Sequence, residues 1–203
     1  MARSARQRLT LRLALNIAGA ALMSASSLVA AQSAGKPSAP TTSAPTAAPS
    51  TDEAYRRGQE FEQKQNYVEA MRWYRVAAAQ GNAMAQVGIG NLYGMGLGVP
   101  QDYGEALRWY RLAAAQGNDE AQNDIGFFYL NGWGTVRDYA QAMNWLRKAG
   151  DQGNYQAQKS IGYMYFKGWG VTPDRAEAIR WFRKAAANGD DDAKEALKEL
   201  GEK

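Results

Sequence analysis

The chain has 203 residues, of which 45% are hydrophobic and 22% charged, and it contains no His and no Cys. This composition is typical of a globular protein, and it excludes disulfides, a thiolate nucleophile, an imidazole base and most zinc or copper ligand sets. The net charge of +4 comes from the N-terminal part, because the basic residues before Asp52, the first acidic residue, are Arg3, Arg6, Arg8, Arg12 and Lys36. The remainder is nearly neutral and carries no basic footprint for nucleic acid.

The first 31 residues predict a signal peptide. Arginines precede an apolar stretch from Leu13 to Ala31, where Val29 and Ala31 fit a cleavage site. We therefore expect an exported protein, periplasmic or secreted, without stable membrane insertion after cleavage. An uncleaved anchor helix is the alternative, which the polar residues inside the stretch disfavour. Residues 32–52 are rich in Ala, Pro, Ser and Thr and predict a disordered linker.

One period of 36 residues governs the rest of the chain. It relates Trp73, Trp109, Trp145 and Trp181, and also Gly81, Gly117, Gly153 and Gly189. Self-similarity at this spacing is typical of stacked helical hairpins, in which no repeat buries its apolar face alone. The tryptophans hold identical places on a predicted helix, which indicates a structural role.

Helix boundaries follow from capping residues in each repeat. The second helices begin after Asn66, Asp102, Asp138 and Asp174, each of which lies three residues before a Glu or Gln. They end near the repeated glycines, and the next first helices begin after Asn82, Asn118, Asn154 and Asp190. Within the first helices, Gly90, Gly126 and Gly162 predict a close approach of two helices, because they carry no side chain.

A glycine-rich loop joins the two helices of each later repeat. The sequence "GMGLGV" returns as "NGWGTV" and "KGWGVT". A dinucleotide fingerprint would occur once, after a strand, whereas this loop recurs and no alternating strand pattern precedes it. The loop therefore predicts a turn and not a phosphate site. Trp133 and Trp169 in these loops are expected to pack on the helices, with exposed anchors as the alternative.

The segment "AQNDIGFFYLNGWGTVRDYAQAMNWLRKAGDQGN" and its neighbours resemble the Sel-one-like repeat, a longer-looped relative of the tetratricopeptide repeat. The resemblance covers residues 83–118, 119–154 and 155–190. Residues 53–82 have a turn that is shorter by four residues and resemble an ordinary tetratricopeptide hairpin, whereas residues 191–203 look like a capping helix. The resemblance implies an all-α fold, a right-handed α/α superhelix of about four hairpins.

The residues give little support for catalysis. Ser160 is the only Ser after Asp52, and no strand-to-helix elbow surrounds it. The acidic cluster at 190–192 is interpreted as a helix cap with favourable charges and not as a calcium or acid-catalytic site. We therefore expect no enzyme activity, no cofactor and no metal.

The resemblance implies a binding scaffold, because such relatives serve as adaptors in protein quality control, envelope assembly and signalling. It places a protein or peptide partner on the concave face of the first helices. The predicted contact residues are Tyr55, Gln59, Val87, Asn91, Asn123, Phe127, Lys159, Tyr163 and Phe166. A glycan-binding or polysaccharide-assembly factor, using exposed Trp133 and Trp169, is the alternative, and a hydrolase is less favoured.

Overall fold

A computed structural model describes residues 49–202 of the chain. The predicted signal peptide and the linker as far as residue 48 lie outside the described residues. All regular elements within 49–202 are helices, which confirms the predicted all-α class. They are α2 (Thr51–Gln63), α3 (Tyr67–Ala79), α4 (Ala83–Met95), α5 (Tyr103–Ala115), α6 (Asp119–Asn131), α7 (Tyr139–Asp151), α8 (Tyr155–Lys167), α9 (Arg175–Ala187) and α10 (Asp191–Glu199).

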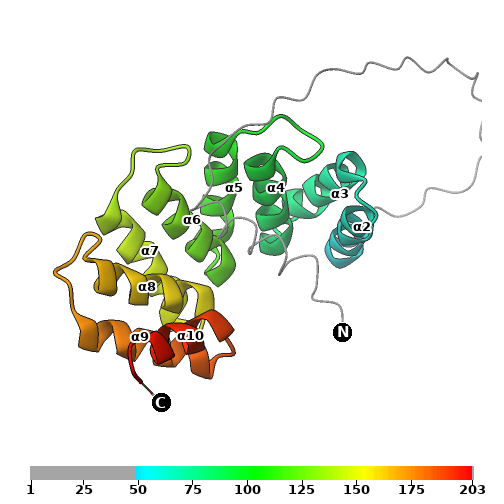
Figure 1. The fold of residues 1–203 in the computed structure, drawn as a ribbon. Coiled ribbons are helices and arrows are strands. Elements are labelled where there is room, and N and C mark those ends of the chain that lie inside the picture. Colours follow the sequence, from blue (N-terminus) through cyan, green and yellow to red (C-terminus); the bar gives the residue numbers. More distant parts are fainter. Residues whose placement is uncertain (1–48, 203) are drawn as a thin grey trace, which may run out of the picture. The chain divides into compact units, whose positions relative to one another are not determined.

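The helices form hairpins that stack in chain order within this unit (Figure 1). Each first helix (α2, α4, α6 and α8) packs along the second helix that follows it, and each second helix packs on the next first helix. Contacts also join α2 to α4 and α6 to α8, whereas no pair of second helices contacts to that extent. The first helices therefore form the inner side of the stack, and α3, α5, α7 and α9 form the outer side.

The predicted capping residues begin the helices in the structure. The Asp102 and Asp138 carboxylates each accept a hydrogen bond of 2.9 Å from the backbone N–H three residues later. Asn82 and Asn118 do the same for the first helices, at 2.7 Å. One boundary differs from the prediction: Ser50 caps α2, which begins at Thr51, so the predicted linker overlaps the first turn of this helix.

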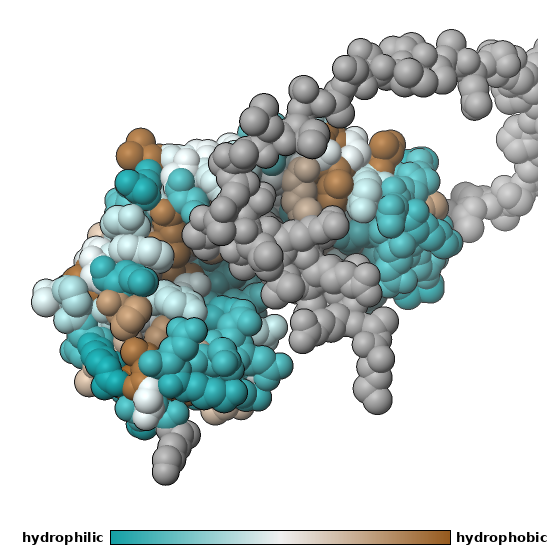
Figure 2. All heavy atoms as spheres, in the orientation of Figure 1, coloured by the Kyte–Doolittle hydropathy of each residue, from teal (hydrophilic) through white to brown (hydrophobic). Residues whose placement is uncertain are grey.

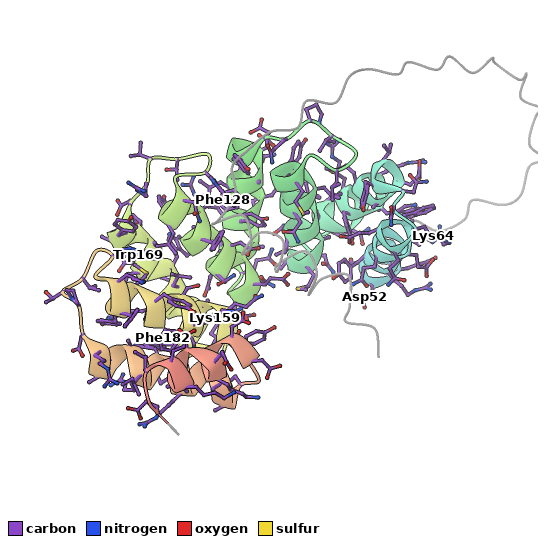
Figure 3. All side chains as sticks on the ribbon, viewed as in Figure 1. Asp52, Lys64, Phe128, Lys159, Trp169 and Phe182 are labelled. Carbon is purple, nitrogen blue, oxygen red and sulfur yellow. The ribbon has the colours of Figure 1, made fainter. Side chains whose placement is uncertain are left out.

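Glycines allow the two helices of a hairpin to approach, as predicted. A Cβ atom on Gly90 would lie 2.5 Å from the Tyr110 ring, and one on Gly162 would lie 2.6 Å from the Phe182 ring. Figure 3 labels Phe182 on α9. Since both aromatic rings are almost fully buried, these contacts hold the largest core side chains against helix backbone.

The buried core runs across the boundaries between repeats. One cluster combines Met71 and Tyr74 of α3 with Ile89 and Leu92 of α4, and a similar cluster joins α4, α5 and α6 through residues such as Val87. A single hairpin would leave these faces exposed. The stability of each hairpin therefore depends on its neighbours, as in other stacked repeat proteins.

The Gly-x-Gly loops pack backward onto the preceding hairpin. Trp133 stacks on Tyr103 with ring centroids 5.2 Å apart, and Trp169 stacks on Tyr139 at 6.3 Å. A Cβ atom on Gly134 would lie 2.5 Å from the Tyr103 carbonyl oxygen, so the backbones of the two hairpins touch at this loop. These contacts confirm the predicted packing for Trp133, whereas Trp169 packs on Tyr139 but remains 37% exposed. They also give the repeated glycine a structural reason.

Candidate interaction surface

The predicted inner face is partly present in the structure. Four predicted contact residues hold equivalent places on successive first helices and are half-buried: Gln59, Asn91, Phe127 and Tyr163. We call them the inner row. Phe166, a further predicted contact residue one turn on from Tyr163, is exposed at 40% and has the Lys167 ammonium 5.0 Å from its ring centroid.

Each inner-row side chain also has an intramolecular contact. The Tyr110 hydroxyl donates to Asn91 Oδ1 at 2.7 Å, and Gln59 Nε2 donates to the Tyr55 hydroxyl at 3.1 Å. Phe127 packs edge-on against Trp133, with ring centroids 5.5 Å apart, and Tyr163 packs edge-on against Phe182 at 5.0 Å. The row is therefore held in place before any ligand arrives, which lowers the entropic cost of binding.

Three predicted contact residues do not lie on an open surface. Val87 is 2% exposed and belongs to the core cluster of α4, α5 and α6, and Asn123, at the equivalent place on α6, is 7% exposed. The prediction that these two side chains line an open face is therefore wrong. The tetratricopeptide-like register marks the position, but the side chains there are buried in the stack.

Lys159, the third of these residues, holds the equivalent place on α8 and is bound within the protein (Figure 3). Its ammonium lies 3.0 Å from an Asp190 carboxylate oxygen and 2.7 Å from one of Asp192, and only 17% of its side chain is exposed. Burial alone would lower the pKa of Lys159, but the Asp192 hydrogen bond and the Asp190 charge outweigh it and raise the pKa. Lys159 therefore docks α10 and is not a free contact for a partner.

An acidic side chain missed by the sequence analysis lies beside the inner row. Burial raises the pKa of the Asp124 carboxyl well above its ordinary value, and the Glu120 charge raises it further. Asn123 Nδ2 donates to Asp124 Oδ1 at 3.2 Å and partly opposes this effect. Asp124 holds the position of Gly88 and Ser160 in the neighbouring repeats, so comparison of the repeats marks it as an exception.

The tryptophans of the second helices are structural, although their burial differs. Trp181 is 4% exposed, whereas Trp73, Trp109 and Trp145 are half-buried. A cationic side chain covers each indole ring; Lys148, for example, lies 4.2 Å from the ring centroid of Trp145. One face of each ring is therefore occupied by a side chain of the same protein.

The surface of the repeat unit is mostly hydrophilic in one view, with separate hydrophobic patches (Figure 2). Within residues 49–202, no group of acidic side chains is arranged to hold a metal ion. None of the helices described there is long and apolar enough to cross a membrane.

Paired helices stacked in one row around a shared core define a tetratricopeptide-like α-solenoid. The Sel1 repeat profile matches residues 50–82, 83–118, 119–154 and 156–190, which include the hairpin with the short turn. The chain belongs to the Sel1 repeat family, as the sequence resemblance indicated. Proteins of this family are generally non-catalytic scaffolds for protein interactions.

Two solved structures illustrate the similarity. One is c5321, a protective antigen present in uropathogenic Escherichia coli strains; it is 37% identical over 74% of this chain, with a TM-score of 0.70. The other is a Sel1 repeat protein from Oxalobacter formigenes, which is 31% identical over 71% of this chain, with a TM-score of 0.67. The matched parts cover 33% and 60% of those two proteins. A search of curated proteins found no match.

Proposed function

We propose that this protein is a non-catalytic adaptor of the cell envelope, which binds an extended peptide or a partner helix along the inner row. The observation that carries the proposal is the repetition of half-buried amide and aromatic side chains at one place on successive first helices. Amide groups pair with a peptide backbone, and aromatic side chains supply apolar anchors. Localisation in the envelope rests on the predicted signal peptide.

The surviving contact set is smaller than the predicted one. Gln59, Asn91, Phe127, Tyr163 and Phe166 remain as candidates, since Val87 and Asn123 are buried and Lys159 is paired. Tyr55 supports Gln59 through the hydrogen bond to its hydroxyl. The row runs from a polar N-terminal end to an aromatic C-terminal end, which fits a ligand that is itself apolar at one end.

The glycan alternative has weaker support. Trp133 is half-buried and packs against Tyr103, Phe127 and Phe128, so its ring is not free for a sugar. Trp169 is 37% exposed but stacks on Tyr139 through one face. The glycan alternative requires both rings to be exposed, and of the two only Trp169 is exposed.

The test compares two double variants in a pulldown from envelope extract. Gln59→Glu with Phe166→Glu places a charge at each end of the contact set, whereas the control, Val68→Glu with Leu112→Glu, does so on exposed positions of α3 and α5. We expect the inner variant to bind the captured partner at least about tenfold more weakly, as measured by calorimetry, because carboxylates would be buried in the interface. The control should stay within about twofold.

Circular dichroism and thermal melting would verify that both variants remain folded. Equal affinities of the inner variant and the unmodified chain would contradict the proposal, as would equal losses in both variants. A glycan array run beside the pulldown separates the alternative: saturable glycan binding with no protein captured would favour the carbohydrate-binding reading.

A further inference from the structure

The outer helices carry a charge pattern that the inner row does not explain. On each of α3, α5, α7 and α9, basic residues outnumber acidic residues. The first helix α6, in contrast, contains Asp119, Glu120 and Asp124 and no basic residue. The described unit is close to neutral, but its positive charge is concentrated on the outer side.

Arginines on the outer helices fall into two rows with different partners. The first row is paired: Arg72, Arg108 and Arg180 lie 3.6, 2.9 and 3.2 Å from carboxylates of Glu69, Glu105 and Glu177 on the same helices. The second row lies three residues further along and recurs every 36 residues. We call it the arginine ladder, and it consists of Arg75, Arg111, Arg147 and Arg183, all of which are exposed.

Within the described residues, the first three arginines of the ladder form hydrogen bonds only with neutral groups. Each guanidinium donates through Nη2 to a tyrosine hydroxyl on the following first helix. The distances are 3.0 Å from Arg75 to Tyr93, 3.1 Å from Arg111 to Tyr129 and 2.5 Å from Arg147 to Tyr165. The tyrosine fixes the position of the guanidinium but leaves its charge without a carboxylate.

Arg183, the fourth arginine of the ladder, shows which kind of group the other three would bind. The repeat position of the tyrosine is occupied by Gly201 after α10, and there Arg183 binds the carboxylate of Glu202. On the same helix, Arg175 donates to the backbone carbonyl of Leu200. The turn that ends α10, with the single carboxylate of Glu202, therefore lies at the end of the ladder. A guanidinium binds a carboxylate more strongly than a neutral hydroxyl, because the hydrogen bonds are charge-assisted.

We propose that Arg75, Arg111 and Arg147 bind the carboxylates of an extended acidic segment of a partner protein, which lies across successive hairpins on the outer side. The contact between Arg183 and Glu202 is the intramolecular example of this interaction. The site is independent of the inner row, and the two could be occupied together.

Other polyanions fit the ladder less well. A flat membrane would meet only part of a row that follows the outer side of a bent stack. Single-stranded nucleic acid needs aromatic faces for stacking, whereas Arg108 and Lys148 cover the rings of Trp109 and Trp145. A protein carboxylate is the group that the chain itself places on the fourth arginine.

The test uses a fluorescein-labelled synthetic peptide of alternating Glu and Ser, long enough to span three hairpins, and measures fluorescence anisotropy with the purified chain. The ladder variant combines Arg75→Gln, Arg111→Gln and Arg147→Gln. The control variant combines Arg72→Gln, Arg108→Gln and Arg180→Gln, which removes the same charge from the paired row. We expect the ladder variant to bind about tenfold more weakly and the control to change by about twofold or less.

A gain of affinity provides a second test. Glu202→Gln frees Arg183 and adds a fourth rung, so the Glu-Ser peptide should bind about threefold more tightly at an ionic strength of about 0.05 M, with a smaller gain at about 0.15 M. If a triple variant melts early, the single variants Arg111→Gln and Arg108→Gln replace the two sets, with the same order of effect.

Several results would overturn the proposal. The first is that the Glu-Ser peptide does not bind saturably. The second is that the matching Gln-Ser peptide binds equally well. The third is that the ladder and control variants lose the same affinity for the Glu-Ser peptide. Preferential binding of a uronic acid oligosaccharide or of single-stranded DNA in parallel titrations would also overturn it, because the partner would then not be a protein.

Discussion

The first hairpin and the later three differ in how their helices are joined. In the first, α2 and α3 are joined by residues 64–66, whereas residues 96–102, 132–138 and 168–174 join the later pairs. Each long loop rests on the second helix of the preceding hairpin, where Gly98, Gly134 and Gly170 contact the segments that begin at Tyr67, Tyr103 and Tyr139. Among the described residues, the first hairpin has no preceding hairpin to contact, and its turn is short.

This difference shows that the Gly-x-Gly loop is a connector between repeats and not only a turn within one. Trp133 and Trp169 in the second and third long loops stack on a tyrosine of the neighbour, whereas the first long loop has Leu97 at this place. The last second helix has Arg175 in the place of that tyrosine. The loop and the tyrosine therefore occur as a pair. The sequence shows both at the same period, but only the structure joins them.

The strongest test of the connector is to obstruct one loop. Gly134→Ala should lower the free energy of unfolding by about 3 kcal/mol, because φ is +64° and the new Cβ would overlap the backbone of Tyr103. Gly153→Ala is the control, since φ is +97° but no atom lies within 4 Å; it should cost about 1 kcal/mol. Urea melts followed by circular dichroism measure both, and equal losses would show that the loop contact contributes nothing.

A graded test removes the aromatic residue instead. Trp133→Ala should cost about 2 to 3 kcal/mol, less than a fully buried tryptophan, because the half-buried ring packs against Tyr103, Phe127 and Phe128. Trp169→Ala should cost about 1 kcal/mol, since the ring is more exposed and stacks on Tyr139 alone. Chemical unfolding of the two variants would check this order, and a larger loss at Trp169 would reverse the interpretation.

The smallest effect is expected in the short turn of the first hairpin. Gln65 adopts φ of +60°, a left-handed conformation that the later loops assign to glycine. Gln65→Gly should therefore raise the free energy of unfolding by about 0.5 to 1 kcal/mol, as the strain of the side chain is removed. A thermal melt compares it with Gln63→Gly, at the exposed last residue of α2, where glycine should destabilise by at most about 1 kcal/mol. A loss at Gln65 would show that the short turn is not strained.

Much of the fold could be predicted because residues with the same structural role recur at the same position of each repeat. The caps, the 36-residue period and the glycines at close helix contacts are local signals, and the structure places them as expected. The contact surface was harder to predict, because exposure depends on the neighbouring repeat. Val87, for example, is buried by residues of neighbouring helices. Lys159 is paired with Asp190 and Asp192, at the start of the helix α10.

The arginine ladder could have been detected in the sequence. Arg75, Arg111 and Arg147 each precede a tyrosine by 18 residues, and the pattern ends where the tyrosine is absent. What the sequence does not contain is the direction of the side chains. It cannot show that the fourth arginine takes a carboxylate from beyond α10, because no spacing rule links Arg183 to Glu202.

Because each long loop packs on the preceding hairpin, these contacts between hairpins all point toward the N-terminal end of the stack. Each of the later hairpins covers part of the hairpin before it. The hairpin of α8 and α9 is the last in this order, so the loop of no later hairpin covers it. Under mechanical tension, hairpins would peel away in order from that end, each detaching its own loop before the next could follow. The two ends of the row would therefore resist force unequally, although their helices are built alike.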